Sequence, residues 1–340
     1  MSGEMHETDG VIYSMAPMEG IGTCYYRRVH RRLFPEGISR YYTPFLSVYP
    51  NLAFKKRDLR EIMPREGEAP EETALRRLLV PQIMAKTAPE IVWAARKLKT
   101  LGFGEINLNL GCPSGTVVRK GGGAGMLADP ARLDALFDGV FSDPDFPGDG
   151  VRLSVKTRLG LRDPEEFDEI LAVFNRYPIC EIILHPRVQE EYYSGKPHRD
   201  LFARTLERTD KPLAYNGDLF TPEDVSGFRR AFPGVKHLML GRGIVANPAL
   251  VREICGGPPL TLSEFRTFLR EITKEYTAIL DNEQQLLLKL KELWYYMGTL
   301  FAAEDGVPPE RLIRNLRTAK NMGEYRNAMR ALFERWPKKT

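Results

Sequence analysis

The segment Glu105-Ile-Asn-Leu-Asn-Leu-Gly-Cys-Pro-Ser114 contains six residues with the pattern of a buried β-strand, followed at once by a sharp turn. Apolar residues alternate with Asn in its first part, and the Gly and Pro of its second part are strong turn formers. The cysteine between them, Cys112, therefore directly follows the end of a strand. Because α/β folds bind ligands at the carboxyl ends of their strands, we expect Cys112 to lie beside a ligand.

Short apolar runs recur on both sides of this segment, with helical stretches between them. Such alternation is the pattern of βα units and of a parallel sheet. The expected strands are Val11–Met15, Tyr41–Phe45, Leu79–Met84, Glu105–Leu110, Leu153–Lys156, Glu181–His185, Leu213–Tyr215 and His237–Leu240. Eight strands separated by helices predict an α/β fold of the TIM (β/α)8 barrel type.

Three of the intervening segments carry clear helix signals. Ala88–Leu101 has apolar residues at helical spacing and a proline in its first turn. Pro130–Phe141 and Pro164–Asn175 each begin with proline after an aspartate, Asp129 or Asp163, that can cap the first turn. These signals support the alternation of strands and helices.

The pattern of alternating strands and helices stops after Pro258-Pro259. The remaining segments are helical in pattern and contain no credible strand; they are Ser263–Leu280, Glu283–Phe301 and Pro309–Trp336. A chain of 340 residues suits a barrel of about 250 residues plus a smaller appendage. We therefore predict a catalytic barrel over residues 1–258 and an all-helical domain over residues 259–340.

Composition and cysteine spacing narrow the class of protein. Hydrophobic content of 43% and charged content of 28% are typical of an ordinary globular protein. The N-terminal residues lack the pattern of a signal peptide and no apolar run approaches about 18 residues, so we expect no membrane segment. The four cysteines are far apart and form no CxxC pair, which favours reduced thiols in the cytoplasm and no metal site. Zinc, Walker and G-x-S-x-G motifs are absent, which argues against metal-dependent and serine hydrolases.

Positive charge is concentrated at the C-terminus. From Arg311 to Thr340 nine Lys or Arg stand against two Glu, a net charge of +7. Because the whole chain carries +4, the preceding 310 residues carry −3. This distribution indicates a local site for a polyanion, although a solvated helical face would have the same composition.

Cys112 is the strongest candidate for a catalytic residue. A thiol with an ordinary pKa of about 8.5 is mostly protonated at neutral pH and can act as a general acid. The alternative is a structural cysteine, which is our expectation for Cys24, Cys180 and Cys255. Glycines at positions 121–123 and 125 follow the turn and would allow close backbone approach to a ligand or a mobile loop over the site.

Polar side chains also stand at the ends of other predicted strands. Gln82 ends the third strand, Lys156 the fifth and His185 the sixth, while Met15-Ala-Pro-Met-Glu-Gly20 ends the first and can present backbone groups to a flat ring. Each residue alone could have a structural role. Their convergence on one end of one barrel favours a functional site.

Two further strand ends predict a phosphate site. Gly241-Arg-Gly-Ile-Val-Ala246 matches the G-x-G-x-x-A dinucleotide fingerprint, but only helices follow it, whereas that fingerprint belongs to a first βαβ unit. Barrels instead bind phosphate with the loops after strands seven and eight. Asn216-Gly-Asp218 and Gly241-Arg242 occupy these positions and predict a cofactor that carries phosphate.

Taken together, these motifs resemble the dihydrouridine synthase family over roughly residues 11–255. The matching segments occur in the family's order and spacing; they are Met15-Ala-Pro-Met18, Gln82, Asn109-Leu-Gly-Cys-Pro113, Val155-Lys-Thr-Arg-Leu-Gly160, His185-Pro-Arg187, Asn216-Gly-Asp218, Gly241-Arg-Gly243 and Asn247-Pro248. Two departures are visible. The family commonly has His-Gly-Arg where this chain has His185-Pro-Arg187, so this loop is stiffer. The family often has a basic run after the cysteine, where this chain has Ser114-Gly115-Thr116.

The resemblance implies an FMN-dependent tRNA-dihydrouridine synthase that uses NADPH. Hydride would pass from flavin N5 to uracil C6, and Cys112 would protonate C5. The residues implied at the isoalloxazine edge are Pro17, Met18 and Glu19, and those at its polar rim are Gln82 and Lys156. The residues implied at ribityl and phosphate are His185, Asn216, Gly217, Asp218, Gly241 and Arg242.

The resemblance also implies an RNA substrate, with Asn109 orienting the base. Arg187, Arg311 and Arg314 are expected to contact the RNA. The basic C-terminal helix would bind phosphates and recognise the shape of the RNA more than its sequence. A base inside folded RNA must leave its stack to reach a barrel mouth. We expect a monomer.

Two alternatives remain open at this stage. An FMN barrel oxidoreductase acting on a small molecule, such as a dihydroorotate dehydrogenase or ene-reductase relative, would share the flavin and phosphate sites but would not need a basic helical tail. A barrel that binds RNA without catalysis would not need Cys112, Lys156 and a complete phosphate site.

Overall fold

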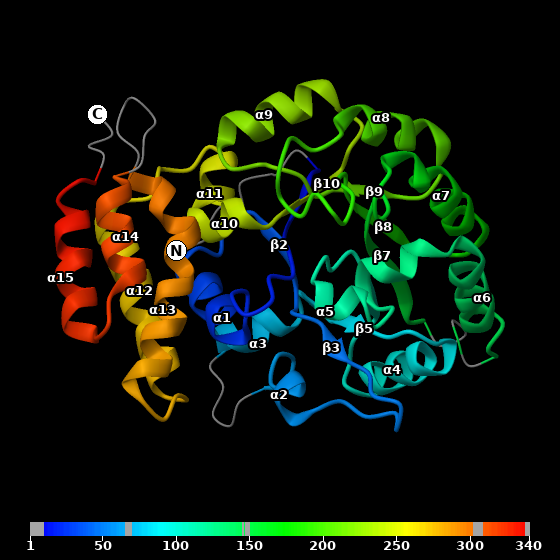
Figure 1. Cartoon of the computed structure of the whole chain (residues 1–340), viewed down its shortest axis with the longest axis horizontal. Helices are drawn as coiled ribbons and strands as arrows, with labels where there is room; N and C mark the ends of the chain where they lie inside the picture. The colour runs from blue at the N-terminus through cyan, green and yellow to red at the C-terminus, as the bar shows by residue number, and fades with distance from the viewer. Residues whose placement is uncertain (1–9, 65–69, 145, 147–149, 302–308, 337–340) are drawn as a thin grey trace.

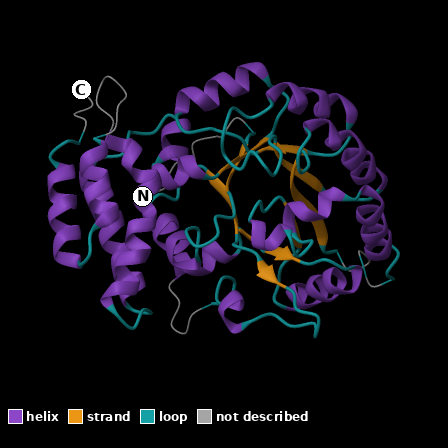
Figure 2. Ribbon diagram, viewed as in Figure 1, coloured by secondary structure: helices purple, strands orange, loops and turns teal. Residues whose placement is uncertain are grey.

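The computed structural model describes residues 10–64, 70–144, 146, 150–301 and 309–336. Its centre is one parallel sheet that curves around the middle of the larger part of the molecule, with helices outside it (Figure 2). The strands are β1 (Ile12–Met15), β2 (Ile38–Tyr42), β3 (Leu46–Ser47), β4 (Leu79–Val80), β5 (Gln82–Met84), β6 (Glu105–Leu110), β7 (Arg152–Arg158), β8 (Glu181–His185), β9 (Leu213–Tyr215) and β10 (His237–Leu240).

The strand pairing closes the sheet into a barrel. The order is β3-β5-β6-β7-β8-β9-β10-β1-β2-β4, so the last strand pairs with the first. At the remaining junction, β4 pairs with β2 and β5 pairs with β6, although only Pro81 separates β4 from β5 in the chain. The extended segment Leu79–Met84 therefore joins the two ends of the sheet, and the predicted barrel is confirmed.

Two of the eight predicted strands are divided. Proline has no N–H to donate to a strand ladder. Pro81 interrupts the predicted strand Leu79–Met84, and Pro44 lies between β2 and β3, so the predicted bounds Tyr41–Phe45 were wrong by about three residues. Nine of the ten short strands overlap the eight predicted ones, and β3 lies just beyond the predicted end at Phe45.

Helices surround the barrel (Figure 1). Those before residue 256 are α1 (Cys24–Leu33), α2 (Lys56–Leu59), α3 (Pro70–Arg76), α4 (Ala88–Thr100), α5 (Gly115–Val118), α6 (Pro130–Phe141), α7 (Phe167–Arg176), α8 (Arg199–Arg208), α9 (Pro222–Ala231), α10 (Arg242–Ala246) and α11 (Leu250–Ile254). The Asp129 side chain caps α6 as predicted, accepting from the Arg132 amide at 3.0 Å. The predicted helix Pro164–Asn175 begins instead as a 3-10 turn over Pro164–Glu166.

Two apolar layers position the strands. Alternate side chains of β6 point to opposite faces of the sheet, so Asn107 and Asn109 face the barrel interior while Leu108 faces the helices. The larger apolar core lies between sheet and helices. A small second core fills the barrel and consists of Ala16, Tyr42, Val80, Ile183, Ala214 and Met239.

The remaining helices form the left part of Figure 1. They are α12 (Leu262–Thr277), α13 (Glu283–Met297), α14 (Glu310–Thr318) and α15 (Met322–Phe333). The helix predicted over Pro309–Trp336 is two helices, because the chain turns after Thr318 and the Asn321 side chain caps α15, accepting from the Glu324 amide at 2.9 Å. Lys338 and Lys339 of the predicted basic tail lie outside the described residues.

The helical part packs directly on the barrel. Tyr26 and Phe268 contact edge to face with ring centroids 5.3 Å apart, and Tyr25 lies 5.7 Å from Tyr276, which joins α1 to α12. The division into two domains at residue 258 stays a prediction. In the part of the chain that the structure describes, no helix has the length and apolar character needed to cross a membrane.

Candidate active site

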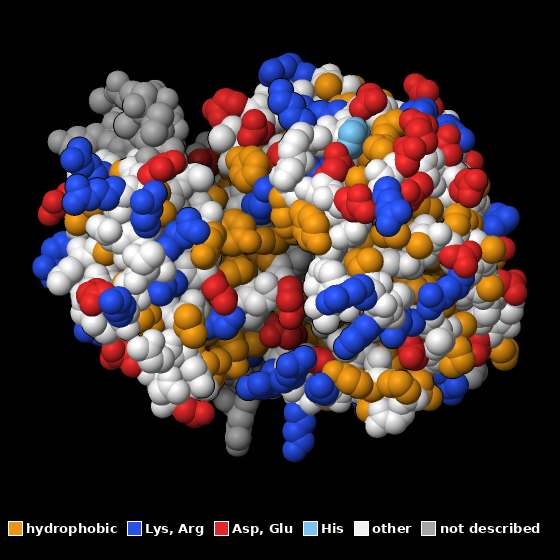
Figure 3. Space-filling model, in the orientation of Figure 1, with side chains coloured by type: hydrophobic (Ala, Val, Ile, Leu, Met, Phe, Trp, Pro, Cys, Tyr) orange, Lys and Arg blue, Asp and Glu red, His pale blue; other side chains and the backbone are white. Residues whose placement is uncertain are grey.

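One pocket at the carboxyl ends of the strands gathers most of the predicted site residues. It is lined by every residue predicted for acid catalysis or cofactor binding, namely Pro17, Met18, Glu19, Gln82, Cys112, Lys156, His185, Asn216, Gly217, Asp218, Gly241 and Arg242. Asn109 lines it as well. Figure 3 shows this region as a hollow with apolar side chains around it, between the barrel and the helical part.

The turn that carries Cys112 is held by a side chain of the preceding strand. The Asn109 side-chain oxygen accepts hydrogen bonds from the amides of Gly111 at 3.1 Å and Cys112 at 2.9 Å. On the other side, the Ala124 amide donates to the Cys112 carbonyl at 3.1 Å. Cys112 is therefore fixed from both directions at the mouth of the barrel.

Close packing at this turn requires a glycine. Gly123 has a φ of +54°, a left-handed conformation that favours glycine. A Cβ at this position would lie 2.9 Å from both Cβ and the carbonyl oxygen of Cys112. The glycine cluster in the sequence thus includes a residue that packs against the cysteine itself.

The Cys112 thiol has the protonation state needed by an acid. It is partly exposed to the pocket, and burial raises its pKa above the ordinary value, with a smaller contribution of the same sign from Glu19. Burial likewise raises the pKa of Glu19. The thiol is therefore protonated at neutral pH and can donate a proton to a bound ligand.

A chain of side-chain hydrogen bonds orients Asn109 from below. Its amide nitrogen donates to Gln82 at 2.7 Å, Gln82 donates to Asn107 at 2.8 Å, and Asn107 donates to Ser154 at 3.0 Å. Gln82 has no exposed surface and both ends of its amide are bonded. Its geometry suits the orientation of Asn109 and, through Asn109, of the Cys112 turn.

The loops after β9 and β10 form the opposite side of the pocket. Asp218 binds two arginines, Arg187 at 2.6 Å and Arg242, while the side-chain nitrogen of Asn216 donates to the Met239 carbonyl at 2.7 Å. A Cβ on Gly243 would lie 2.2 Å from the Leu219 carbonyl oxygen, so the two loops can approach only because position 243 is glycine. This is the place where barrels bind phosphate.

Comparison with known proteins assigns this arrangement to a family. A sequence model described as dihydrouridine synthase matches residues 14–307, most of the chain. The chain belongs to the dihydrouridine synthase family. The resemblance inferred from the motifs is thereby confirmed, and with it a flavin-dependent oxidoreductase.

Curated relatives support this assignment. A tRNA-dihydrouridine(16) synthase of Neisseria meningitidis serogroup A is 29% identical over 243 residues, covering 70% of this chain and 71% of the relative. A protein of the same name from Cupriavidus necator is 29% identical and covers 74% and 83%. The tRNA-dihydrouridine synthase B of Pseudomonas aeruginosa is 25% identical and covers 86% and 85%. The reaction of the family is the reduction of uridine in tRNA.

Solved structures share the barrel at low sequence identity. A complex of 2-naphthoyl-CoA reductase aligns with a TM-score of 0.52 and 12% identity, covering 72% of this chain and 50% of that one. TcOYE with pHBA aligns with a TM-score of 0.51 and 10% identity, covering 79% and 95%. At this identity the likeness supports the fold alone.

The pocket of this synthase is rich in buried positive charge. Burial, and secondarily the nearby Arg158, lower the pKa of the Lys156 ammonium to about 7. Burial and the surrounding cations, among them Lys156, Arg158 and Arg187, also hold the pKa of His185 well below its ordinary value, so its imidazole is neutral and accepts a hydrogen bond from Arg187 at 3.0 Å. Buried cations are stabilised by an anionic partner, and a flavin nucleotide brings a phosphate to such a site.

Arg187 does not lie where it was expected. Its side chain has no exposed surface and does not line the pocket; it binds Asp218 and the carbonyls of Ser194 and Gly195. The position of Arg187 therefore does not support the prediction that this residue contacts RNA. Its buried side chain instead holds Asp218 in place. Arg242, by contrast, lines the pocket, and its guanidinium lies 4.6 Å from the ring centroid of Tyr193.

Several lining residues were missed by the sequence reasoning. Arg158 donates to the carbonyls of Gly111 at 3.0 Å, Val188 at 2.9 Å and Tyr192 at 2.8 Å, joining the Cys112 turn to the loop after β8. Residues two apart on a strand share a face, so its spacing from Lys156 was an available signal. The other lining residues that were missed include Pro44, Phe45, Tyr193, Phe220 and Tyr296.

The two remaining predicted residues lie apart from this pocket. Arg311 and Arg314 are exposed on α14 and do not line it. Arg314 instead lines a second groove in the helical part, between α13 and α14. Their prediction as RNA contacts stays a prediction.

Proposed function

We propose that this chain reduces the C5–C6 double bond of a uridine in tRNA with FMN held at the barrel mouth and NADPH as the reductant. The observation that carries the proposal is the position of Cys112, a protonated thiol fixed at the edge of a cationic pocket. A hydride donor and an acid on one pocket are what the reduction of a polarised double bond requires.

The residues around the pocket fit FMN. The loops that contain Asp218 and Arg242 would hold the phosphate, with the guanidinium of Arg242 as its positive partner. Pro17 and Met18 would line one edge of the ring system, and the Lys156 ammonium would favour the electron-rich reduced form. When bound, FMN would supply the hydride that is added to C6 of uracil.

The chain itself would supply the proton. Cys112 would transfer its thiol proton to C5 as the hydride reaches C6, so that the double bond becomes a single bond and the thiolate left behind regains a proton from solvent. Asn109 would orient the base beside it. NADPH would restore the flavin, giving one NADPH consumed for each uridine reduced.

The tRNA must present its uridine in an extruded form. The lining residues lie at the strand ends inside a ring of helices, so a base stacked within a folded RNA cannot reach Cys112. Extrusion costs a few kcal/mol, less for a base that is already unpaired. An unpaired uridine in a loop is therefore the favoured substrate. The comparisons do not favour the small-molecule alternative.

The relatives also suggest which uridine is modified. Those of Neisseria meningitidis and Cupriavidus necator are named for position 16, and we propose this position for the present chain. The four free cysteines support an action in the reducing cytoplasm. The monomeric state stays a prediction.

The proposed function is tested with Cys112→Ala. The purified variant receives NADPH and unmodified tRNA, and dihydrouridine is mapped by mass spectrometry of RNase fragments. We expect reduction of the flavin by NADPH at the rate of the unsubstituted protein, but formation of dihydrouridine slowed by about 10²- to 10⁴-fold, the contribution typical of a general acid.

Cys180→Ala is the matched control, since Cys180 lies outside this pocket. It should leave both rates unchanged. Formation of dihydrouridine by Cys112→Ala at a near-normal rate would refute the assignment of the acid. Dihydrouridine at a position other than 16 in the control reaction would refute the proposed position while leaving the chemistry intact.

A further inference from the structure

The helical part has a groove of its own between α13 and α14. Tyr295 of α13 and Thr299 of the following 3-10 turn (Gly298–Phe301) line one side, and Arg314, Arg317 and Thr318 of α14 line the other, with Glu310 at one end. Nothing in the proposed chemistry uses this groove. The buried side chains of Trp294 and Ile313 form its floor, and polar and aromatic side chains form its rim.

Tyr295 is the most exposed large apolar side chain in the described part of the protein, at 62%. One face of its ring is covered by the guanidinium of Arg317, whose central carbon lies 3.6 Å from the ring centroid. This stacking holds the ring in place while most of its surface faces solvent. A fixed and exposed aromatic ring beside an arginine is the surface on which unpaired bases stack in RNA-binding proteins.

The charge of the surrounding surface matches RNA. Arg311, Arg314 and Arg317 follow one another at three-residue intervals along α14, and none of them forms an ion pair with the described residues. Figure 3 shows Lys and Arg side chains gathered over the helical part beside the central hollow. A row of unpaired guanidinium groups fits a backbone of phosphates.

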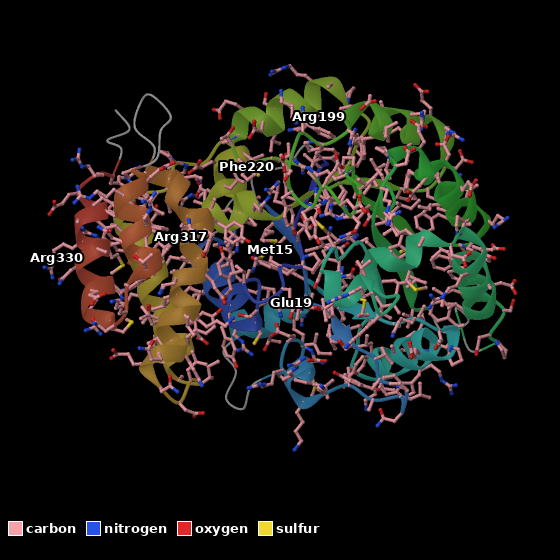
Figure 4. All side chains as sticks on the ribbon, viewed as in Figure 1. Met15, Glu19, Arg199, Phe220, Arg317 and Arg330 are labelled. Carbon is pink, nitrogen blue, oxygen red and sulfur yellow. The ribbon has the colours of Figure 1, made fainter. Side chains whose placement is uncertain are left out.

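The groove is adjacent to the mouth of the active site. Tyr296, the next residue along α13, lines the active-site pocket, so consecutive residues of one helix face the two sites. A helix with its side chains is about 10–12 Å wide, which sets the scale of the separation. In Figure 4, Arg317 lies on the helical part, and Phe220 and Glu19, which line the active-site pocket, lie to its right, toward the barrel.

From these observations we propose that the groove between α13 and α14 binds an unpaired nucleotide of the tRNA that lies close to the reduced uridine. Its base stacks on Tyr295, and its phosphates are bound by Arg314 and Arg317. The inference rests on the proposed function and adds a second contact to it: Cys112 acts on one nucleotide, and the Tyr295–Arg317 pair holds another.

The test compares variants in equilibrium binding of unmodified tRNA at several salt concentrations. Tyr295→Ala should weaken binding by about 5- to 150-fold, the range expected for loss of one base stack. Tyr295→Phe should bind as well as the unsubstituted protein because it retains the ring. Arg317→Ala should weaken binding and lower the slope of log affinity against log salt by about 1.

Lys97→Ala is the control for charge, because Lys97 is exposed on α4, far from the helical part (Figure 1). It should leave the affinity and the slope unchanged. Equal affinity of Tyr295→Ala and the unsubstituted protein would overturn the proposal. So would a change in self-association, measured by sedimentation, without a change in RNA affinity.

The outcome can be separated from that of the proposed function. Binding is measured without NADPH, so it does not depend on whether uridine is reduced. Reduction of the flavin by NADPH should be the same for all four variants, since none of these residues lines the active-site pocket. A protein that binds tRNA through this groove but forms no dihydrouridine would support the groove and refute the proposed function.

Discussion

At the scale of a single residue, the pKa of Lys156 depends on the residues that surround it in the folded protein. The position of Lys156 close to a strand end follows from the sequence, because the Val155-Lys-Thr-Arg-Leu-Gly160 segment begins with a β pattern and ends in a glycine; the strand itself runs two residues beyond the predicted end at Lys156, to Arg158. Its low pKa does not follow from the sequence, since it arises from burial in the pocket and from Arg158 on the same face of β7. The pairing of Arg187 with Asp218 was equally unpredictable, because it joins two loops separated by 31 residues.

The lowered pKa of Lys156 predicts a pH dependence of stability. In the cofactor-free folded protein the ammonium loses its proton near pH 7, whereas in the unfolded chain it does so near 10.5. Between these values the unfolded state binds more protons, so the free energy of unfolding rises with pH. We expect a rise of at most about 1.4 kcal/mol per pH unit from pH 7 to 9, measured by urea unfolding.

Lys156→Met isolates this contribution from other titrating groups. It removes the charge and keeps an unbranched side chain, so the difference between variant and unsubstituted protein should depend on pH with the slope just given. A difference that stays constant from pH 7 to 9 would show that the ammonium keeps its proton in the folded protein.

At the scale of elements, the sequence predicted the presence of the strands more accurately than the positions at which they are interrupted. Pro44 and Pro81 divide two strands, and both breaks could have been read from the missing N–H of proline. The glycine cluster after Cys112 was predicted to allow close approach to a ligand or a mobile loop. The structure gives one of these glycines a different role, since Gly123 packs against the cysteine.

Gly123→Ala should therefore harm both stability and catalysis. A residue other than glycine at a φ of +54° costs about 1–2 kcal/mol, and the new methyl group would press on Cys112 from 2.9 Å. We expect a loss of at least this size in urea unfolding and slower formation of dihydrouridine, because the thiol is displaced. Gly115→Ala is the matched control, as its Cβ would meet no atom within 4 Å. Equal activity of both variants would show that the Cys112 turn tolerates the displacement.

At the scale of the whole molecule, the helical part was predicted but its place was not. Its helices follow from local periodicity, whereas its position depends on contacts such as Tyr26–Phe268 between residues more than 200 positions apart. That position brings Tyr296 to the barrel mouth and Tyr295 to the second groove. The active site and the proposed RNA contact are thus joined by one helix, α13.

Helices α14 and α15 carry the basic C-terminus and also form part of the apolar core, so deleting them would remove core contacts as well as charge. Helices α14 and α15 bury six apolar side chains, which are Ile313, Leu316, Met322, Tyr325, Leu332 and Phe333. They cover Trp294, whose indole N–H donates to the Tyr325 hydroxyl at 2.8 Å. Each such side chain contributes about 1.5–3 kcal/mol on burial, so the six together rival the 5–15 kcal/mol of a whole protein.

A chain ending at residue 308 should therefore lose its cooperative unfolding transition or show a much lower Tm, and it should bind a hydrophobic dye through the uncovered core. A chain ending at Trp336 retains all six side chains and should unfold at the Tm of the full protein. The measurement is thermal unfolding followed by near-ultraviolet circular dichroism. An unchanged Tm for the shorter chain would mean that α14 and α15 add no stability to the rest. If the Tm falls, weak RNA binding by that chain would reflect lost structure as much as lost charge, and the Tyr295 and Arg317 variants become the decisive test of the RNA contact.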